Sequence, residues 1–137
     1  MADKIRKIEY FYTIAPNRPG VGAKILAELR DAGVNLLAFS GFPHGRGAQI
    51  DFVPDHSAGF KAAARKAGLE LSAKKTGFLI QGDDKTGAVA RIMGKLAKVK
   101  VNVTAIDAVC AGKGRYGAIM WVKPSDVSKA AKALGAS

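Results

Sequence analysis

Hydrophobic and polar positions follow two different periods along this chain. Ile8, Tyr10, Tyr12 and Ile14 are spaced two apart, as in a β-strand. The apolar residues after 17–20 return every three or four positions, as on one face of an α-helix. Up to residue 71, the pattern predicts a strand at 8–14, a helix ended by Gly33, a strand at 34–42, a turn at 45–47, a strand at 48–52, a helix between Pro54 and Gly68, and a short strand through Leu69 and Leu71.

The second half of the chain repeats the first. A shift of 67 positions places Pro19-Gly20 on Thr86-Gly87 without a gap. The identical pairs at this offset are Gly20 and Gly87, Ala23 and Ala90, Ile25 and Ile92, Leu29 and Leu96, Val34 and Val101, Asn35 and Asn102, and Ala38 and Ala105. Such agreement indicates that one structural unit has been duplicated.

The second copy lacks residues for its last strand. It predicts a strand at 78–81, a helix through Val89 to Leu96, strands at 101–110 and 116–122 joined by a turn at 112–114, and a helix from Pro124 to Leu134. Only Gly135-Ala136-Ser137 follow. We therefore expect a first module at residues 1–74 and a second at 75–137 whose last strand is missing. Another segment or another chain would have to complete that sheet edge, which favours a homodimer.

Both copies have the order βαββαβ. This is the ferredoxin-like arrangement, an α+β fold with the helices on one face of an antiparallel sheet. Many unrelated activities use this fold, so the function has to be inferred from particular residues.

The composition is that of a globular protein. Of the 137 residues, 48% are hydrophobic, which is enough for a packed core. No apolar run approaches the roughly 20 residues that span a bilayer, and the first residues lack the apolar core of a secretory signal. Cys110 is the only cysteine, which excludes an intrachain disulfide and a cysteine metal cage. We expect a cytoplasmic protein without membrane association.

The charge balance is strongly basic. Twenty-two Lys and Arg against 11 Asp and Glu give a net charge of +11, which can indicate a nucleic-acid interface. However, no block of five or six like charges is present, and Lys61, Arg65 and Lys66 recur at helical spacing. This pattern favours solvated outer helix faces, so nucleic acid is not the expected partner.

Residues 17–20 have the composition of a carboxylate site. A Pro-Gly turn that opens a helix leaves backbone N–H groups free, and the helix dipole adds partial positive charge. Asn17 and Asn35 flank the predicted helix, and an amide can accept from an ammonium group or donate to a carboxylate. Each asparagine also has a structural explanation, since Asn17 could shape the turn and Asn35 could cap the backbone after Gly33.

Residues 15–21 and 32–36 together resemble the signature of ACT domains, the ligand-sensing modules of many enzymes of amino-acid metabolism. Residues 83–88 and 101–103 of the second copy resemble it more weakly. The resemblance covers about residues 5–135 and implies an amino-acid-like ligand between two modules, held by the loop and the second strand. The ligand-binding residues that it implies are Asn17, Arg18, Pro19, Gly20, Val21, Asn35, Leu36, Asp84, Thr86, Gly87, Ala88, Asn102 and Val103.

Asn17 and Asn35 also match the asparagine pair of the serine-binding ACT domains of phosphoglycerate dehydrogenase. Those domains carry a histidine two residues before the first asparagine, where this chain has Ala15, so the resemblance does not extend to serine as the ligand. In the second copy the pair becomes Asp84 and Asn102. The two sites should therefore differ, and Asp84 favours an ammonium group.

We expect a non-catalytic regulatory protein that binds an amino-acid-like ligand at an ACT–ACT interface and shifts domain or subunit packing. The role implies a regulated enzyme as partner and requires no cofactor or metal. His44 and His56 lie in predicted loops without a nucleophile at a recognisable spacing. A metal site formed by Asp51, Asp55 and His56 is less expected than a solvated loop.

Two other functions stay open. RNA-recognition motifs share the βαββαβ order and place stacking aromatics on the third and first strands. Residues 115–121 resemble that third-strand signature in part, with Tyr116 and Trp121 as the stacking candidates, although Ile119 stands where an aromatic is wanted. The other alternative is a module that binds protein and no small ligand.

Overall fold

The computed structural model describes residues 3–137. The elements are β1 (Lys4–Pro16), α1 (Val21–Asp31), β2 (Leu36–His44), β3 (Gly47–Pro54), α2 (Ser57–Lys66), β4 (Lys75–Asp83), α3 (Ala88–Lys98), β5 (Val103–Gly112), β6 (Arg115–Val122), the 3-10 helix η1 (Pro124–Asp126) and α4 (Val127–Leu134). The strands are hydrogen-bonded in the order β2-β3-β1-β4-β6-β5. This is an α+β fold with four α-helices and antiparallel strands, as the sequence predicts, but the strands form one six-stranded sheet and not two separate sheets. No helix among the described residues is long and apolar enough to cross a membrane.

The residues separate into two compact units. One unit consists of residues 9–75, and the other combines residues 76–137 with the start of the chain up to Ile8. β1 therefore contributes its first residues to one unit and the rest to the other. We describe each unit by itself.

Residues 4–8 of β1 take the place of the strand that the second copy lacks. β1 is the neighbour of β4 in the strand order, and Ile5 joins the core that β4, α3, β6 and α4 form. The end of the chain lies beside this segment, because the Ser137 amide donates to the Ile5 carbonyl (3.1 Å) and the Lys7 amide donates to the Ser137 carbonyl (3.0 Å). The boundary expected after residue 74 would place residues 3–8 in the first module, whereas in the structure they belong to the same unit as residues 76–137. The edge beside β4 is occupied, so it gives no reason to expect a homodimer.

The unit of residues 9–75 has an aromatic core. Phe11, Phe52 and Phe60 are at most 1% exposed, and the ring centroid of Phe60 lies 5.4 Å from that of Phe11 and 5.2 Å from that of Phe52. Ile25 and Leu29 of the predicted apolar stripe on α1 pack against this cluster. The strand expected through Leu69 and Leu71 is not a strand in the structure.

Hydrogen bonds to side chains replace part of a strand ladder in this segment. The Thr13 hydroxyl donates to the Glu70 carbonyl (2.8 Å), and the Ser72 amide donates to the Tyr12 carbonyl (2.8 Å). The Tyr12 amide donates to the Ser72 hydroxyl (3.0 Å) and not to a main-chain oxygen. Residues 70–72 therefore lie beside β1 without forming a regular strand.

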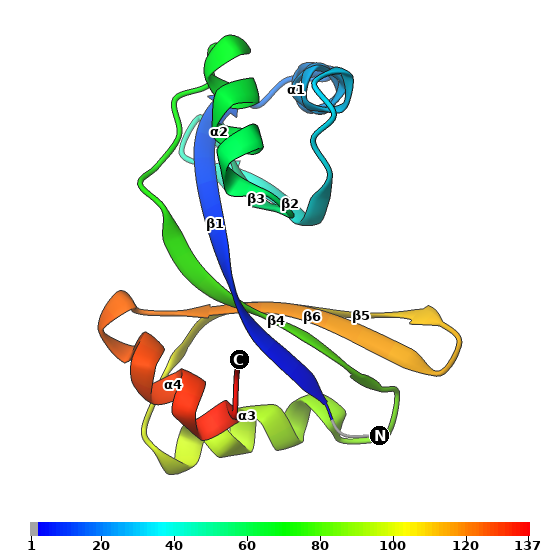
Figure 1. Ribbon diagram of the computed structural model, residues 1–137, viewed down its shortest axis with the longest axis vertical. Coiled ribbons are helices and arrows are strands. Elements are labelled where there is room, and N and C mark those ends of the chain that lie inside the picture. Colours follow the sequence, from blue (N-terminus) through cyan, green and yellow to red (C-terminus); the bar gives the residue numbers. More distant parts are fainter. Residues whose placement is uncertain (1–2) are drawn as a thin grey trace. The chain divides into compact units, whose positions relative to one another are not determined.

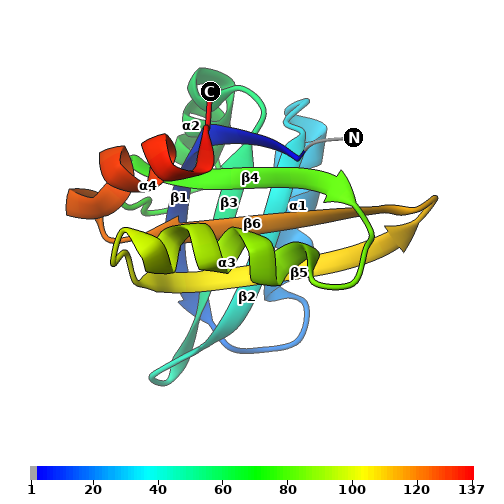
Figure 2. The same cartoon turned by 90° about the horizontal axis from the view of Figure 1, so that it is seen from below.

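The other unit packs α3 and α4 on the same side of β4, β6 and β5 (Figure 1; Figure 2). β6 alternates strictly between half-buried and buried side chains, as expected of a strand with one face on the core. The largest fully buried side chains of this unit come from β4, α3 and β6: Phe78, Ile80, Ile92, Leu96 and Met120.

Candidate ligand-binding site

The loop between β1 and α1 opens a helix whose N-terminus no side chain caps. Gly20 is the N-cap residue of α1 in a left-handed conformation (φ 88°), no side chain caps this helix end, and the first turn contains no acidic residue. The Val21 amide is taken by the Arg18 carbonyl (3.3 Å). Residues 17–20 are exposed to solvent. The loop therefore has the geometry of an anion site that no group of its own chain fills.

Asn17 and Asn35 lie beyond opposite ends of α1. The helix has 11 residues and is about 16 Å long. Both asparagines are exposed, and the Asn35 carbonyl accepts the Asp55 amide (3.1 Å) just before Leu36 begins β2. One amino acid is too short to reach both side chains across this helix, so the two asparagines do not converge within one unit.

The corresponding loop of the second copy borders a pocket of about 270 Å³. Gly87 is the left-handed N-cap of α3 (φ 81°), and the Asp84 amide donates to the Gly114 carbonyl (2.9 Å). The pocket is lined by Asp84, Lys85, Gly87, Ala88, Val89, Ala90, Ala108, Val109, Cys110 and Tyr116. Three of the predicted residues are among these, whereas Thr86, Asn102 and Val103 are not. Sequence reasoning missed the β5 contribution, because only the strand register shows which β5 residues face the loop.

Asp84 and Cys110 interact inside this pocket. Cys110 is exposed. The pKa of its thiol is raised, mainly by a hydrogen bond with the Asp84 carboxylate and to a smaller extent by partial loss of solvent. An exposed thiol with a raised pKa is mostly protonated near neutral pH and therefore a weak nucleophile. Cys110 is thus better placed to report on this pocket than to react in it.

Asp84→Asn is expected to make Cys110 more reactive. The substitution removes the carboxylate that opposes thiolate formation, so alkylation by iodoacetamide at pH 8 should accelerate at least about twofold and its pH profile should move to lower pH. Asp107→Asn removes an exposed carboxylate from β5, the strand that carries Cys110, and serves as the control. Equal rates in the two variants would show that Asp84 does not control the thiol.

A larger groove of about 510 Å³ lies in the unit of residues 9–75. Of the predicted residues, it includes Arg18 and Val21. Its lining consists of Thr13, Ile14, Ala15, Pro16, Arg18, Val21, Lys24, Ile25, Glu28, Ala67, Gly68, Leu69 and Glu70. The groove is lined by the cations Arg18 and Lys24, by the carboxylates Glu28 and Glu70, and by apolar side chains. This combination of charges suits a small zwitterion. The sequence analysis did not predict that residues 67–70 line this groove.

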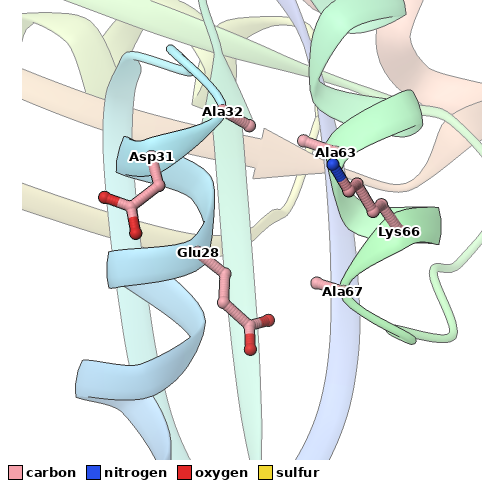
Figure 3. A pocket seen from close by; sticks show the side chains of 6 residues that line it. All are labelled: Glu28, Asp31, Ala32, Ala63, Lys66 and Ala67. Carbon is pink, nitrogen blue, oxygen red and sulfur yellow. The ribbon is translucent and has the colours of Figure 1, made fainter.

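A third pocket of about 370 Å³ lies between the C-terminal halves of α1 and α2 (Figure 3). Its charged side chains are Glu28, Asp31 and Lys66, and the remaining wall consists of Ala32, Ala63 and Ala67. None of the predicted ligand-binding residues lines it.

The residues considered for catalysis or metal binding do not form such a site among the residues that the structure describes. His44 ends β2 and does not lie in a loop. Asp51 is buried in β3 and accepts a hydrogen bond from Gln49 (2.9 Å), so the expected solvated loop is wrong for this residue. Within residues 3–137, no three His, Cys, Asp or Glu side chains are grouped so that they could hold a metal ion.

The two aromatic residues proposed to stack on RNA lie on opposite faces of β6. Tyr116 is buried in the core of its unit, together with Met120 on the same face. Trp121 is five positions further along the strand and therefore on the other face. Their separation removes the pair on which the RNA-recognition-motif alternative depends.

Comparisons with known proteins identify the fold. No family model and no curated protein matches the sequence. Protein BT0572 from Bacteroides thetaiotaomicron has a similar structure, with a TM-score of 0.82, 14% identity, and coverage of 96% of this chain and 88% of that one. The regulatory subunit of aspartate kinase from Thermus thermophilus, in its ligand-free form, matches with a TM-score of 0.64, 16% identity and coverage of 98% and 93%. The regulatory subunit of aspartate kinase from Thermus flavus matches with a TM-score of 0.59 and 18% identity, over 98% of this chain and 94% of that one. The chain has the ACT-type fold of these regulatory domains.

Proposed function

We propose that this chain is a non-catalytic regulatory protein with two ACT modules that binds a small amino-acid-like ligand at an interface between ACT modules. The observation that carries the proposal is the likeness to regulatory subunits of aspartate kinase over nearly the full length of both chains. Those proteins are regulatory subunits, which supports a role without catalysis. Ligand binding would favour one packing of domains or subunits over another and thereby act on a partner enzyme.

The placement of the two asparagines supports a ligand shared between modules. Asn17 and Asn35 are separated by α1, so a ligand that contacts both kinds of position needs the loop of one module and the second strand of another. A homodimer is one assembly that supplies such a pair. In this arrangement the α1 N-terminus takes the carboxylate and an asparagine side chain takes the ammonium group.

Thermal unfolding with each of the twenty amino acids at 1 mM tests this proposal. A ligand with a dissociation constant near 10 µM would stabilise the protein by about 2.7 kcal/mol, or about 8 °C in Tm for a chain of this size. Asn17→Ala and Asn35→Ala are expected to abolish the shift. Gln81→Ala removes an exposed amide from β4 and should retain it.

Absence of a shift with every amino acid would contradict the proposed ligand class. A shift that both asparagine variants retain would instead place the ligand elsewhere. Alkylation of Cys110 then distinguishes the loops, because a ligand at the second loop should protect this thiol and a ligand at the first should not.

A further inference from the structure

Most of the positive charge belongs to one unit. Residues 3–8 and 76–137 carry 13 Lys or Arg and five Asp or Glu, which gives +8 of the chain's net +11. Residues 9–75 carry nine and six, which gives +3. The charges that are scattered in the sequence are therefore concentrated by the fold.

Five of these cations are exposed residues of two helices that contact each other. On α3, Arg91, Lys95 and Lys98 follow at intervals of four and three, which places them on one side of the helix. On α4, Lys129 and Lys132 are also one turn apart. All five are exposed, and neither helix contains an acidic residue. We call these five residues the basic helix face.

The two helices lie side by side, which brings the helices that carry the five charges together (Figure 1; Figure 2). α3 and α4 contact each other and run in opposite directions across the same side of the strands (Figure 1; Figure 2). Arg91, Lys95 and the α4 residue Leu134 line one common pocket, to which Asp3 and Asp83 contribute carboxylates, so two of the three α3 cations lie on the side of α4. The apolar sides of both helices are buried through Ile92 and Ala130.

Most of this charge is not neutralised by the protein. Arg91 pairs with Asp3, whose carboxylate lies 2.6 Å from the guanidinium. Within residues 3–137, no ion pair joins any of the four lysines to a carboxylate. Four lysines without a carboxylate partner on two neighbouring helices favour an anionic partner that screens their charge.

The side chains of this face select among anionic partners. Neither helix contains an aromatic residue, and Met93, at 36%, is their only notably exposed large apolar residue. Protein interfaces are enriched in aromatic residues and depleted in lysine, single strands are held by aromatic stacking, and membrane-bound helices insert several apolar side chains. A lysine surface without these groups fits the closely spaced phosphates of a duplex.

We propose that the basic helix face binds the phosphate backbone of double-stranded nucleic acid without reading its base sequence. This goes beyond the proposed function and does not depend on an amino-acid ligand. Four lysine–phosphate contacts give a slope of about −3.6 for log K against log salt concentration. Raising the salt from 50 to 200 mM should then weaken binding about a hundredfold.

Fluorescence anisotropy of a labelled 20-bp DNA duplex tests the proposal in the full-length protein. The variant Lys95→Gln/Lys98→Gln/Lys129→Gln/Lys132→Gln should bind at least about tenfold more weakly at 50 mM salt and lose most of the salt dependence. The variant Arg46→Gln/Lys61→Gln/Arg65→Gln/Lys66→Gln removes the same charge from exposed residues of the other unit and should bind within about threefold of the unaltered protein. Thermal unfolding confirms that both variants are folded.

Three results would overturn the proposal. Equal weakening in both variants would mean that only the net charge matters. Tighter binding to single-stranded RNA, lost in Trp121→Ala, would assign binding to the face of β6 that carries Trp121. Binding to phosphatidylglycerol vesicles without binding to the duplex would assign the face to a lipid surface.

Discussion

Ile5→Ala is expected to destabilise the unit formed by residues 76–137, although Ile5 lies 70 or more residues away from it in sequence. Ile5 is 6% exposed and packs in the core with Phe78 and Met120. Truncating a buried isoleucine to alanine costs about 2–5 kcal/mol. The loss should fall on this unit, because residues 4–8 supply the strand beside β4 and hydrogen-bond to Ser137.

Hydrogen exchange measures this effect by location. In Ile5→Ala, the free energy of opening at the amides of Ile80 and Met120 should fall by about 2–5 kcal/mol. The amide of Phe52 in the other unit serves as the internal reference. Arg6→Ala changes the exposed neighbouring residue and should leave all three amides protected. Equal losses at Phe52 and Met120 would show that β1 does not serve the two units separately.

A second substitution tests the same segment from β4. A Cβ at Gly82 would meet the Asp3 carboxylate and would lie 2.6 Å from Cε1 of Tyr116. Gly82→Ala should therefore displace the Asp3 side chain and the Tyr116 ring and cost about 1–3 kcal/mol. Gly117→Ala is the matched strand control, because its nearest neighbour, the Ile80 carbonyl oxygen, lies at 3.8 Å.

The repeat and the two periods were sufficient to predict the order of the helices and of the other strands, because each helix and hairpin is specified by local residues, whereas the strand expected through Leu69 and Leu71 did not form. The role of β1 was not predictable in this way. Its buried side changes along the strand, from Ile8 and Tyr10 to Phe11 and Ala15, and Ile14 is 50% exposed. Both sides of this strand are apolar, so alternation alone could not indicate which residues face a core or that two cores share the strand.

The candidate site shows a similar division between local and nonlocal information. The loop that opens α1 and its counterpart before α3 follow from local turn chemistry, and both have the left-handed glycine that such a turn requires. The β5 wall around Cys110 depends on strand pairing, which a single sequence does not specify. In contrast, the separation of Tyr116 and Trp121 was predictable, since residues five apart in a strand point to opposite faces.

Phe60→Ala is expected to be the most damaging single truncation in the unit of residues 9–75. Phe60 is 0% exposed, and its ring contacts both Phe11 and Phe52. Removing a buried phenylalanine side chain costs about 3–5 kcal/mol, and each lost aromatic pair adds about 0.5–1.5 kcal/mol. A loss of this size is a large part of the stability of a small protein.

Urea unfolding provides the measurement, with Phe42→Ala as the control because Phe42 is 40% exposed on β2 and should cost less than about 1 kcal/mol. If Phe60→Ala does not fold, Phe60→Leu retains most of the volume and should still cost about 1 kcal/mol. Similar midpoints for the Phe60 and Phe42 variants would contradict the assignment of this ring to the core.

Because α2 carries Phe60 and α1 carries Ile25 and Leu29 into the same cluster, loss of this ring should also loosen the α1 N-terminus. The amino-acid-induced thermal shift should therefore weaken in Phe60→Leu, whereas Phe42→Ala should retain it.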